Sequence, residues 1–111
     1  MNNEEFVEKL INKGLNNETK LQKKIQKYLK DLGAYEFKVH GSQYMKAGIP
    51  DIICCYQGKF IGIETKVGKN KMSKIQEQHK KDIEKAGGIH ILAYSLEDVQ
   101  KSLRKLFTII D

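Results

Sequence analysis

The chain has 111 residues, of which 40% are hydrophobic and 31% charged, the balance of one globular domain rather than a disordered segment. Its 20 basic residues outnumber its 14 acidic residues, and the formal net charge of +6 favours a polyanionic partner. There is no apolar run near the ~20 residues that span a bilayer, and the polar, acidic start is unlike a signal peptide. We therefore expect a cytoplasmic protein with no membrane segment.

Two helices of unequal strength are predicted at the N-terminal end. Residues 1–16 have apolar side chains at helical spacing until Gly14 interrupts them, which indicates a short helix or a partly ordered arm. The next helix, over residues 18–32, has a continuous apolar stripe, with Asn17 as its N-cap and Gly33 as the C′ residue that ends it. This pattern divides the chain into an arm, residues 1–16, and one domain, residues 17–111.

A strand and a hairpin are predicted next. Residues 34–40 alternate between apolar and polar side chains, which is typical of a half-buried strand. Residues 51–66 hold two apolar runs around a turn at Gln57-Gly58, as in a β-hairpin. A turn centred there pairs Tyr56 with Lys59 and therefore places Asp51 opposite Glu64 on one face. A register slip of one residue would move Asp51 to the other face, so the expected site depends on this turn.

The remaining segments predict an α/β fold. We expect a helix over residues 74–86 capped by Ser73, a strand over 89–94, and a helix from a cap at Ser95 to about residue 107. A helix between the hairpin and the strand that follows it favours a parallel crossover. The expected fold is a small mixed β-sheet flanked by helices.

Three polar residues meet at the open end of the expected hairpin. Asp51 follows Pro50, the chain's one proline, and Glu64 and Lys66 lie two residues apart, hence on one face of their strand. Two carboxylates so close repel each other, and a hard divalent cation such as Mg²⁺ or Mn²⁺ relieves that repulsion. A zinc site is not expected, because the adjacent cysteines and dispersed histidines lack zinc-ligand spacing. The alternative interpretation is an ordinary surface cluster of ion pairs at a strand end.

The sequence also resembles a known nuclease family. Gly48-Ile49-Pro50-Asp51 followed by Glu64-Thr65-Lys66 is similar to the PD-(D/E)xK signature, and more narrowly to the VRR-NUC (virus-type replication-repair nuclease) domain. The similarity extends from Glu18 to about Val99. It includes further short motifs: Leu32-Gly33-Ala34, Ser73-x-x-Gln76, Ala86-Gly87-Gly88 and Ser95-x-x-Asp98-Val99. The chain resembles the stand-alone phage or bacterial members, since it lacks large accessory domains.

The resemblance implies a restriction-endonuclease-like core and metal-dependent hydrolysis of DNA phosphodiesters. Asp51 and Glu64 match the metal ligands, the Thr65 carbonyl matches a third ligand, and Lys66 matches the catalytic lysine. Glu18 matches an acidic residue that is often a further ligand, although its position also suits a simple partner of the helix dipole. Gln76 matches a polar residue that faces the site, although it is equally compatible with an ordinary surface glutamine.

The DNA contacts are expected from a set of basic and polar residues around this site. Lys69 and Lys71 follow the catalytic lysine directly, and their phosphate contacts would be independent of DNA sequence. The full expected set is Lys38, His40, Ser42, Lys69, Lys71 and Lys74.

The resemblance further implies a homodimer that cuts branched DNA such as four-way (Holliday) junctions, in a bacterial or phage-infected cell. The dimer could form through the arm at residues 6–11 or through the apolar segment 106–110. Two alternatives stay open. One is a non-catalytic module that binds structured DNA, and the other is a restriction-type endonuclease with the same core.

Overall fold

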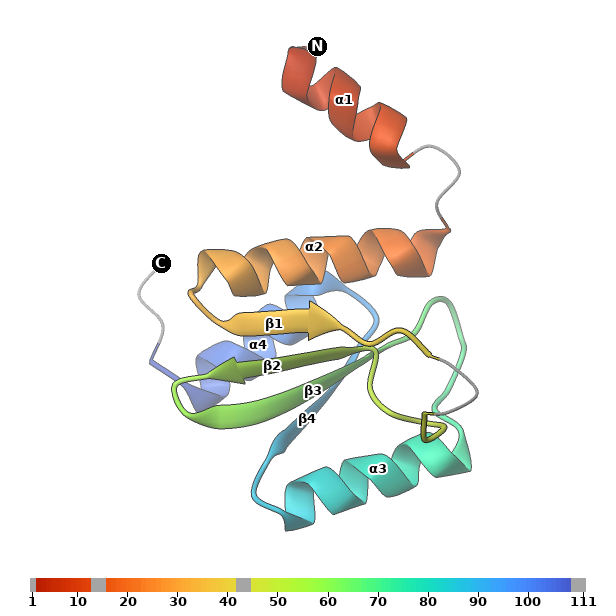
Figure 1. The fold of residues 1–111 in the computed structure, drawn as a ribbon, viewed down its shortest axis with the longest axis vertical. Helices are drawn as coiled ribbons and strands as arrows, with labels where there is room; N and C mark the ends of the chain where they lie inside the picture. Colours follow the sequence, from red (N-terminus) through yellow and green to blue (C-terminus); the bar gives the residue numbers. More distant parts are fainter. Residues whose placement is uncertain (1, 13–15, 42–44, 109–111) are drawn as a thin grey trace.

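The computed structural model describes residues 2–12, 16–41 and 45–108 of the 111-residue chain. Four helices and four strands occur in these ranges (Figure 1). In chain order they are α1 (Asn3–Asn12), α2 (Asn17–Asp31), β1 (Tyr35–Lys38), β2 (Ile52–Tyr56), β3 (Lys59–Thr65), α3 (Lys74–Lys85), β4 (Ile89–Ala93) and α4 (Leu96–Leu106). None of the helices in these ranges combines the length and the apolar character needed to cross a bilayer.

The strands form one mixed sheet in the order β1-β2-β3-β4. The first two neighbouring pairs are antiparallel, whereas β3 and β4 are parallel and are joined through α3. The predicted crossover and the mixed sheet are therefore confirmed. The division of the chain at residue 16 stays a prediction.

The hairpin register is the one that the turn predicts. Tyr56 pairs with Lys59 and Ile52 pairs with Ile63, so the pairing continues toward Asp51 and Glu64 at the open end. Gln57 and Gly58 both have positive φ, 49° and 77°, the combination that a type I′ turn requires. This turn matches the twist of the two strands and sets their register locally.

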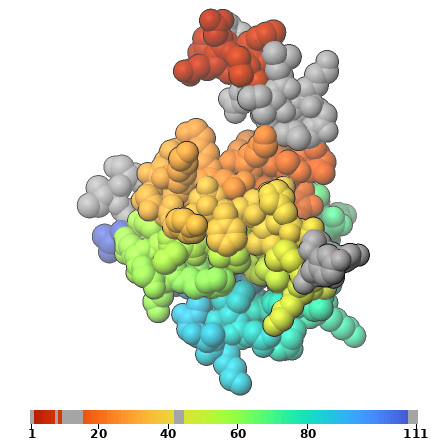
Figure 2. Space-filling model, in the orientation of Figure 1, coloured from red at the N-terminus to blue at the C-terminus, as the bar shows by residue number. Residues whose placement is uncertain are grey.

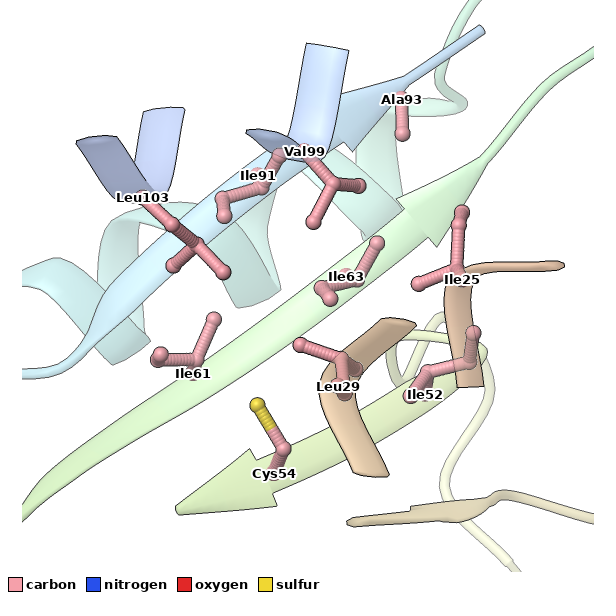
Figure 3. Close-up of a cluster of buried hydrophobic side chains, with 10 residues drawn as sticks. All are labelled: Ile25, Leu29, Ile52, Cys54, Ile61, Ile63, Ile91, Ala93, Val99 and Leu103. Atoms are coloured by element: carbon pink, nitrogen blue, oxygen red, sulfur yellow. The ribbon is translucent and has the colours of Figure 1, made fainter. Parts of the chain in front are cut away.

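The core lies between one face of the sheet and the helices α2 and α4 (Figure 3). Ile25 and Leu29 of α2 and Val99 and Leu103 of α4 point toward one another and toward the strands in Figure 3. The strands contribute every second residue, because alternate side chains share a face. The strand residues of this core are Ile52, Cys54, Ile61, Ile63, Ile91 and Ala93.

Helix α3 covers part of the opposite face, and it does so without a fully buried side chain. It approaches β3 closely because Gly62 has no side chain. A Cβ atom there would lie 2.8 Å from Cγ of Pro50 and 3.2 Å from Cδ1 of Ile83. The chain therefore packs Pro50, which precedes Asp51, directly between β3 and α3.

Two local expectations differ from the structure. The N-cap of α2 is Asn16 rather than Asn17, because the Asn16 side chain accepts the Thr19 N–H bond at 2.7 Å. Ser95 caps α4 as expected by accepting the Asp98 N–H, and the Asp98 carboxylate accepts the Tyr94 N–H. Of the two cysteines, Cys54 is buried and Cys55 is exposed. The last difference concerns β1.

The aromatic side of β1 is exposed instead of buried. Tyr35 retains 75% of its surface and Phe37 retains 45%, while α2 packs against the other side of the strand. The same sheet face continues through Cys55 of β2 and Phe60 of β3, both of which are exposed. Figure 2 shows β1 and the hairpin at the surface between α2 and α3.

Candidate functional site

The site is built around the last two residues of β3. Glu64 and Thr65 are neighbours in a strand, so their side chains point to opposite faces of the sheet. Both are buried, with 2% and 0% of their surface exposed. Two polar side chains at the end of a buried strand need partners on both faces, and α2 and α3 supply them.

Asp51 reaches this strand end from the segment that enters β2. Its Oδ2 accepts two hydrogen bonds from Thr65, one from the backbone N–H and one from the hydroxyl, each 2.8 Å long. Its backbone carbonyl accepts a 2.8 Å bond from the N–H of Val39. Backbone and side chain of Asp51 are thus both fixed.

Glu64 is held on the α3 side and is only partly satisfied. Its Oε1 accepts a 2.9 Å hydrogen bond from Nε2 of Gln76 and lies 3.9 Å from Nζ of Lys66. Its Oε2 is buried and, when Glu64 is ionised, receives no hydrogen bond from the described residues. A buried carboxylate oxygen without a partner is costly, so this atom marks a position where a ligand would be stabilised.

The surroundings of Glu64 raise its pKa to about 8. Burial is the largest cause, because it disfavours the charged form, and the negative charge of Asp51 is the next. Lys66 acts in the opposite direction, while a hydrogen bond from protonated Glu64 to Asp51 and the charge of Glu18 raise the pKa further. The site therefore carries more negative charge than its own residues neutralise.

A divalent cation fits this donor set. The available donors are carboxylate oxygens of Asp51 and Glu64, the hard ligands that Mg²⁺ and Mn²⁺ prefer, and one of these oxygens is buried and unpartnered. Among the described residues, no group of three or more Asp, Glu, His or Cys side chains is close enough to hold a metal by itself. A Mg²⁺ ion usually takes one or two carboxylates and keeps several waters, so two carboxylates suffice.

Glu18 lies in the first turn of α2, next to the site but outside the carboxylate pair. Its Oε1 is 3.3 Å from the Thr65 hydroxyl, and its charge contributes to the raised pKa of Glu64. Its position in the first turn also suits the helix dipole. This position is compatible with both interpretations of Glu18, a metal ligand and a partner of the helix dipole. That Glu18 and the Thr65 carbonyl are metal ligands stays a prediction.

Gln76 combines both roles that its sequence context allows. Its Oε1 accepts the N–H of Ser73 and so completes the capping box of α3, while its Nε2 donates to Glu64. The helix cap therefore fixes the amide that holds Glu64. The glutamine is part of the site and of the helix start at once.

Gln22 is a buried polar residue of the site that the sequence prediction did not include. It lies on α2, is 5% exposed, and donates a 2.8 Å hydrogen bond from Nε2 to the Thr65 hydroxyl. A signal was present in the sequence. Gln22 occupies an inward position, since Ile25 and Leu29 follow it at i+3 and i+7 on the same helix face.

The predicted basic residues belong to two separate parts of the structure. Lys38 and His40 line a groove of about 520 Å³ between α2 and β1, together with Lys23 of α2. Lys69 and Lys71 are exposed on the segment between β3 and α3, and Lys74 begins α3. Ser42 lies outside the described residues. A further groove, of about 250 Å³, is lined by residues 39, 41 and 45–51 and includes Asp51.

His79 connects α3 to the segment that leads to Asp51. Its Nε2 lies 2.8 Å from the carbonyl oxygen of Ala47, in the segment that leads to Pro50 and Asp51. Gly48, next to Ala47, has φ +82° and leaves space for Ile75 and His79. Helix α3 thus also holds the segment that enters the site.

Comparisons with known proteins agree with this architecture. A solved VRR-NUC domain superposes with a TM-score of 0.69 at 22% sequence identity, over 81% of this chain and 97% of that chain. The chain has a VRR-NUC-like, restriction-endonuclease-like fold. The Holliday junction resolvase Hjc of Archaeoglobus fulgidus superposes with a TM-score of 0.55 at 18% identity, over 69% of this chain and 67% of that chain. Neither a family model nor a curated protein matches the sequence.

The VRR-NUC-like fold confirms the predicted fold class. At these identities the likeness concerns the fold, so the chemistry of this chain has to be argued from its own residues. Those residues provide a carboxylate pair at the end of β3, the adjacent Lys66 and a buried Glu64 oxygen that accepts no hydrogen bond from the described residues.

Proposed function

We propose that this chain is a divalent-metal-dependent endonuclease that hydrolyses DNA phosphodiesters, with branched DNA as its substrate class. The observation that carries the proposal is the meeting of Asp51 and Glu64 at one strand end, with a buried Glu64 oxygen unpartnered. An ordinary ion-pair cluster would neutralise its own charge at an exposed strand end. Here a buried carboxylate has, among the described side chains, one cation within 4 Å, Nζ of Lys66 at 3.9 Å.

In the proposed reaction each residue has a distinct task. Asp51 and Glu64 would hold Mg²⁺ or Mn²⁺, with Glu18 and the Thr65 carbonyl as further candidate ligands. The ion would supply Lewis-acid activation of the phosphoryl oxygen and a lowered pKa for a bound water. Lys66 would orient the attacking water or stabilise the charge that develops on the phosphorus oxygens. Hydrolysis forms one P–O bond to the water oxygen and breaks one P–O bond to a sugar oxygen.

The charge distribution supports a nucleic-acid substrate. Basic residues of α2 and β1 line one groove, together with Glu36, and further exposed lysines lie on the segment between β3 and α3. A DNA strand crossing the site would place phosphates next to both groups, which favours binding through the backbone rather than through base readout. The described residues contain no additional segment that would recognise a base sequence. We therefore favour an endonuclease for branched DNA over a restriction-type endonuclease.

We propose that the active form is a homodimer. A four-way junction offers symmetry-related strands, and paired cuts require two copies of a single-site chain, most simply related by a two-fold axis. The exposed face of Tyr35, Phe37, Cys55 and Phe60 offers apolar surface for such contact. The two places suggested by sequence are exposed as well, at Phe6 and Val7 and at Leu106. Residues 109 and 110 lie outside the described ranges.

The direct test is cleavage by purified protein of four-way-junction, flap and duplex DNA with Mg²⁺, Mn²⁺ or EDTA. We expect metal-dependent products, preferentially from branched DNA, and a loss of at least ~100-fold in Asp51→Asn and Glu64→Gln. Asp31→Asn is the matched control, because Asp31 makes an exposed ion pair with Lys27 away from the site. This control should keep wild-type activity.

The alternative function gives a different pattern. A non-catalytic binding module would bind branched DNA equally well in EDTA and release no product under any metal condition. Cleavage that persists in Asp51→Asn would contradict the proposed site even if the chain is a nuclease. Light scattering of wild type beside Phe37→Glu and Leu106→Glu tests the dimer, and a monomeric wild type bound to a junction would contradict it.

A further inference from the structure

Gln22 and the hydroxyl of Thr65 form a buried connection between α2 and Asp51. The two residues are 43 positions apart in sequence, and a single 2.8 Å hydrogen bond joins them inside the fold. Gln22 is 5% exposed and Thr65 is fully buried. A glutamine amide in such a position needs a partner, and its partner here touches a candidate metal ligand.

The donor and acceptor groups of the Thr65 hydroxyl determine which way each hydrogen bond runs. A threonine hydroxyl has one hydrogen to donate and lone pairs that accept. Gln22 donates through Nε2, so the Thr65 oxygen accepts that bond and its own hydrogen is available for a carboxylate. Two carboxylates compete for it, Asp51 at 2.8 Å and Glu18 at 3.3 Å, and the shorter contact is the stronger one.

The result is a carboxylate fixed in one orientation. Oδ2 of Asp51 receives both the hydroxyl and the backbone N–H of Thr65, so Oδ1 is turned away from Thr65. The backbone bond depends only on the strand. The hydroxyl bond depends on the rotamer of Thr65, which the Gln22 amide holds from the core side.

We propose that Gln22 is a positioning residue that acts through the Thr65 hydroxyl to orient Asp51 toward a divalent cation. This inference rests on the proposed metal-dependent function. It assigns a positioning role to a residue whose amide contacts Thr65 rather than either carboxylate of the pair. It also explains why a polar residue occupies an inward position of α2, where an aliphatic side chain would pack with Ile25 and Leu29.

The test is Mn²⁺ affinity measured by calorimetry on wild type, Gln22→Met, Thr65→Val and the double variant, with folding checked by circular dichroism. We expect about tenfold weaker Mn²⁺ binding in each single variant, because loss of a residue that orients a ligand typically costs 10–100-fold. The double variant should be no weaker than Thr65→Val, since Gln22 acts only through that hydroxyl. Thr65→Ser, which keeps the hydroxyl, should restore binding.

Gln26→Met is the matched control on the same helix. Gln26 donates a 2.9 Å hydrogen bond to Glu36, away from the carboxylate pair, so its loss should lower stability without changing Mn²⁺ affinity. At saturating Mn²⁺, DNA cleavage by Gln22→Met should return to near the wild-type rate, since orientation rather than chemistry is impaired.

The outcomes separate this inference from the proposed function. If wild type binds Mn²⁺ and Gln22→Met binds equally well, the inference is wrong and the function stands. If Gln22→Met weakens binding further in the Thr65→Val background, the relay through the hydroxyl is wrong. If Gln22→Met does not fold, the comparison of Thr65→Val with Thr65→Ser still decides whether the hydroxyl orients Asp51. If wild type shows neither binding nor cleavage, both proposals fail.

Discussion

Helices α2 and α3 each bring one glutamine to the end of β3, but they are attached to the sheet in different ways. Helix α2 buries Ile25 and Leu29 in the core beside Gln22, whereas α3 has no buried residue and brings Gln76 through its capping box. The two helices also approach opposite sheet faces, as seen from the alternation of Thr65 and Glu64. Asp51 is therefore held through a helix that is packed in the core. Glu64 is held through α3, where substitutions should lower the free energy of unfolding less.

The largest expected effect is a loss of stability when the contact between α2 and the core is weakened. Leu29→Ala removes a fully buried side chain from α2, which typically costs about 2–5 kcal/mol. Ile83→Ala on α3 is the matched variant, and because Ile83 is only half-buried its cost should be about 1 kcal/mol. Urea denaturation of both proteins measures the difference. Equal losses would contradict the proposed division between the two helices.

The next effect concerns the pH dependence of stability and arises at Glu64. Its folded-state pKa of about 8 exceeds the ordinary value of 4.5, so its stabilising contribution is complete below pH 4.5. Between pH 4.5 and 8 the unfolded chain loses this proton while the folded chain keeps it. The metal-free protein should thus lose about 2–5 kcal/mol across this window, with little further change from Glu64 above it.

Glu64→Gln is the control for this pH dependence. The difference in unfolding free energy between wild type and this variant isolates Glu64, because other groups contribute to both. One of them is His90, whose pKa is lowered by burial, so its contribution is lost as the pH falls below 6.5 and runs opposite to that of Glu64. A difference that does not change with pH would show that Glu64 is ionised in the folded protein without metal.

Metal affinity should have the opposite pH dependence and should increase as the pH rises. The cation requires ionised Glu64, so Mn²⁺ affinity should rise by up to tenfold per pH unit between pH 6 and 8 as the proton is displaced. Calorimetry in buffers of different ionisation enthalpy counts the released proton. If the stability comparison with Glu64→Gln shows the raised pKa but Mn²⁺ affinity does not change with pH in this range, Glu64 is not a ligand.

A smaller effect tests the close approach of α3. Gly62→Ala would place a Cβ atom 2.8 Å from Pro50 and 3.2 Å from Ile83, and such overpacking costs about 1–3 kcal/mol. Because Pro50 precedes Asp51, the DNA-cleavage rate should fall as well. Gly41→Ala is the matched control for stability, since no atom of the described residues lies within 4 Å of its added methyl group. Thermal unfolding and junction cleavage measure the two effects.

The smallest expected effect is at the cap of α3. Ser73→Ala removes the acceptor of the Gln76 N–H bond, which typically costs about 1 kcal/mol. Asn16→Ala removes the corresponding cap of α2 and should cost a similar amount. Ser73→Ala should weaken Mn²⁺ binding more than Asn16→Ala, because it loosens the first turn of α3, which carries the Gln76 that holds Glu64. Equal effects on binding would show that the α3 cap has no special connection to the site.

The sequence by itself determined the local features of this protein. The turn at Gln57-Gly58 specifies the hairpin register, and that register brings Asp51 and Glu64 to one strand end. Gly33, in the left-handed conformation, ends α2, and Ser73 begins α3 as predicted. These features depend on residues close together in the chain, whose backbone preferences and hydrogen bonds act before any tertiary contact.

Only the tertiary structure decided which faces are covered and which distant side chains meet. The alternation in β1 indicates two faces but not which one α2 covers, and Tyr35 and Phe37 proved to be exposed. Gln22 has an inward position in the sequence pattern, yet nothing in that pattern identifies Thr65, 43 residues away, as its partner. The physical reason is that burial and hydrogen-bond pairing are properties of packed elements, and the packing fixes which polar groups must satisfy one another.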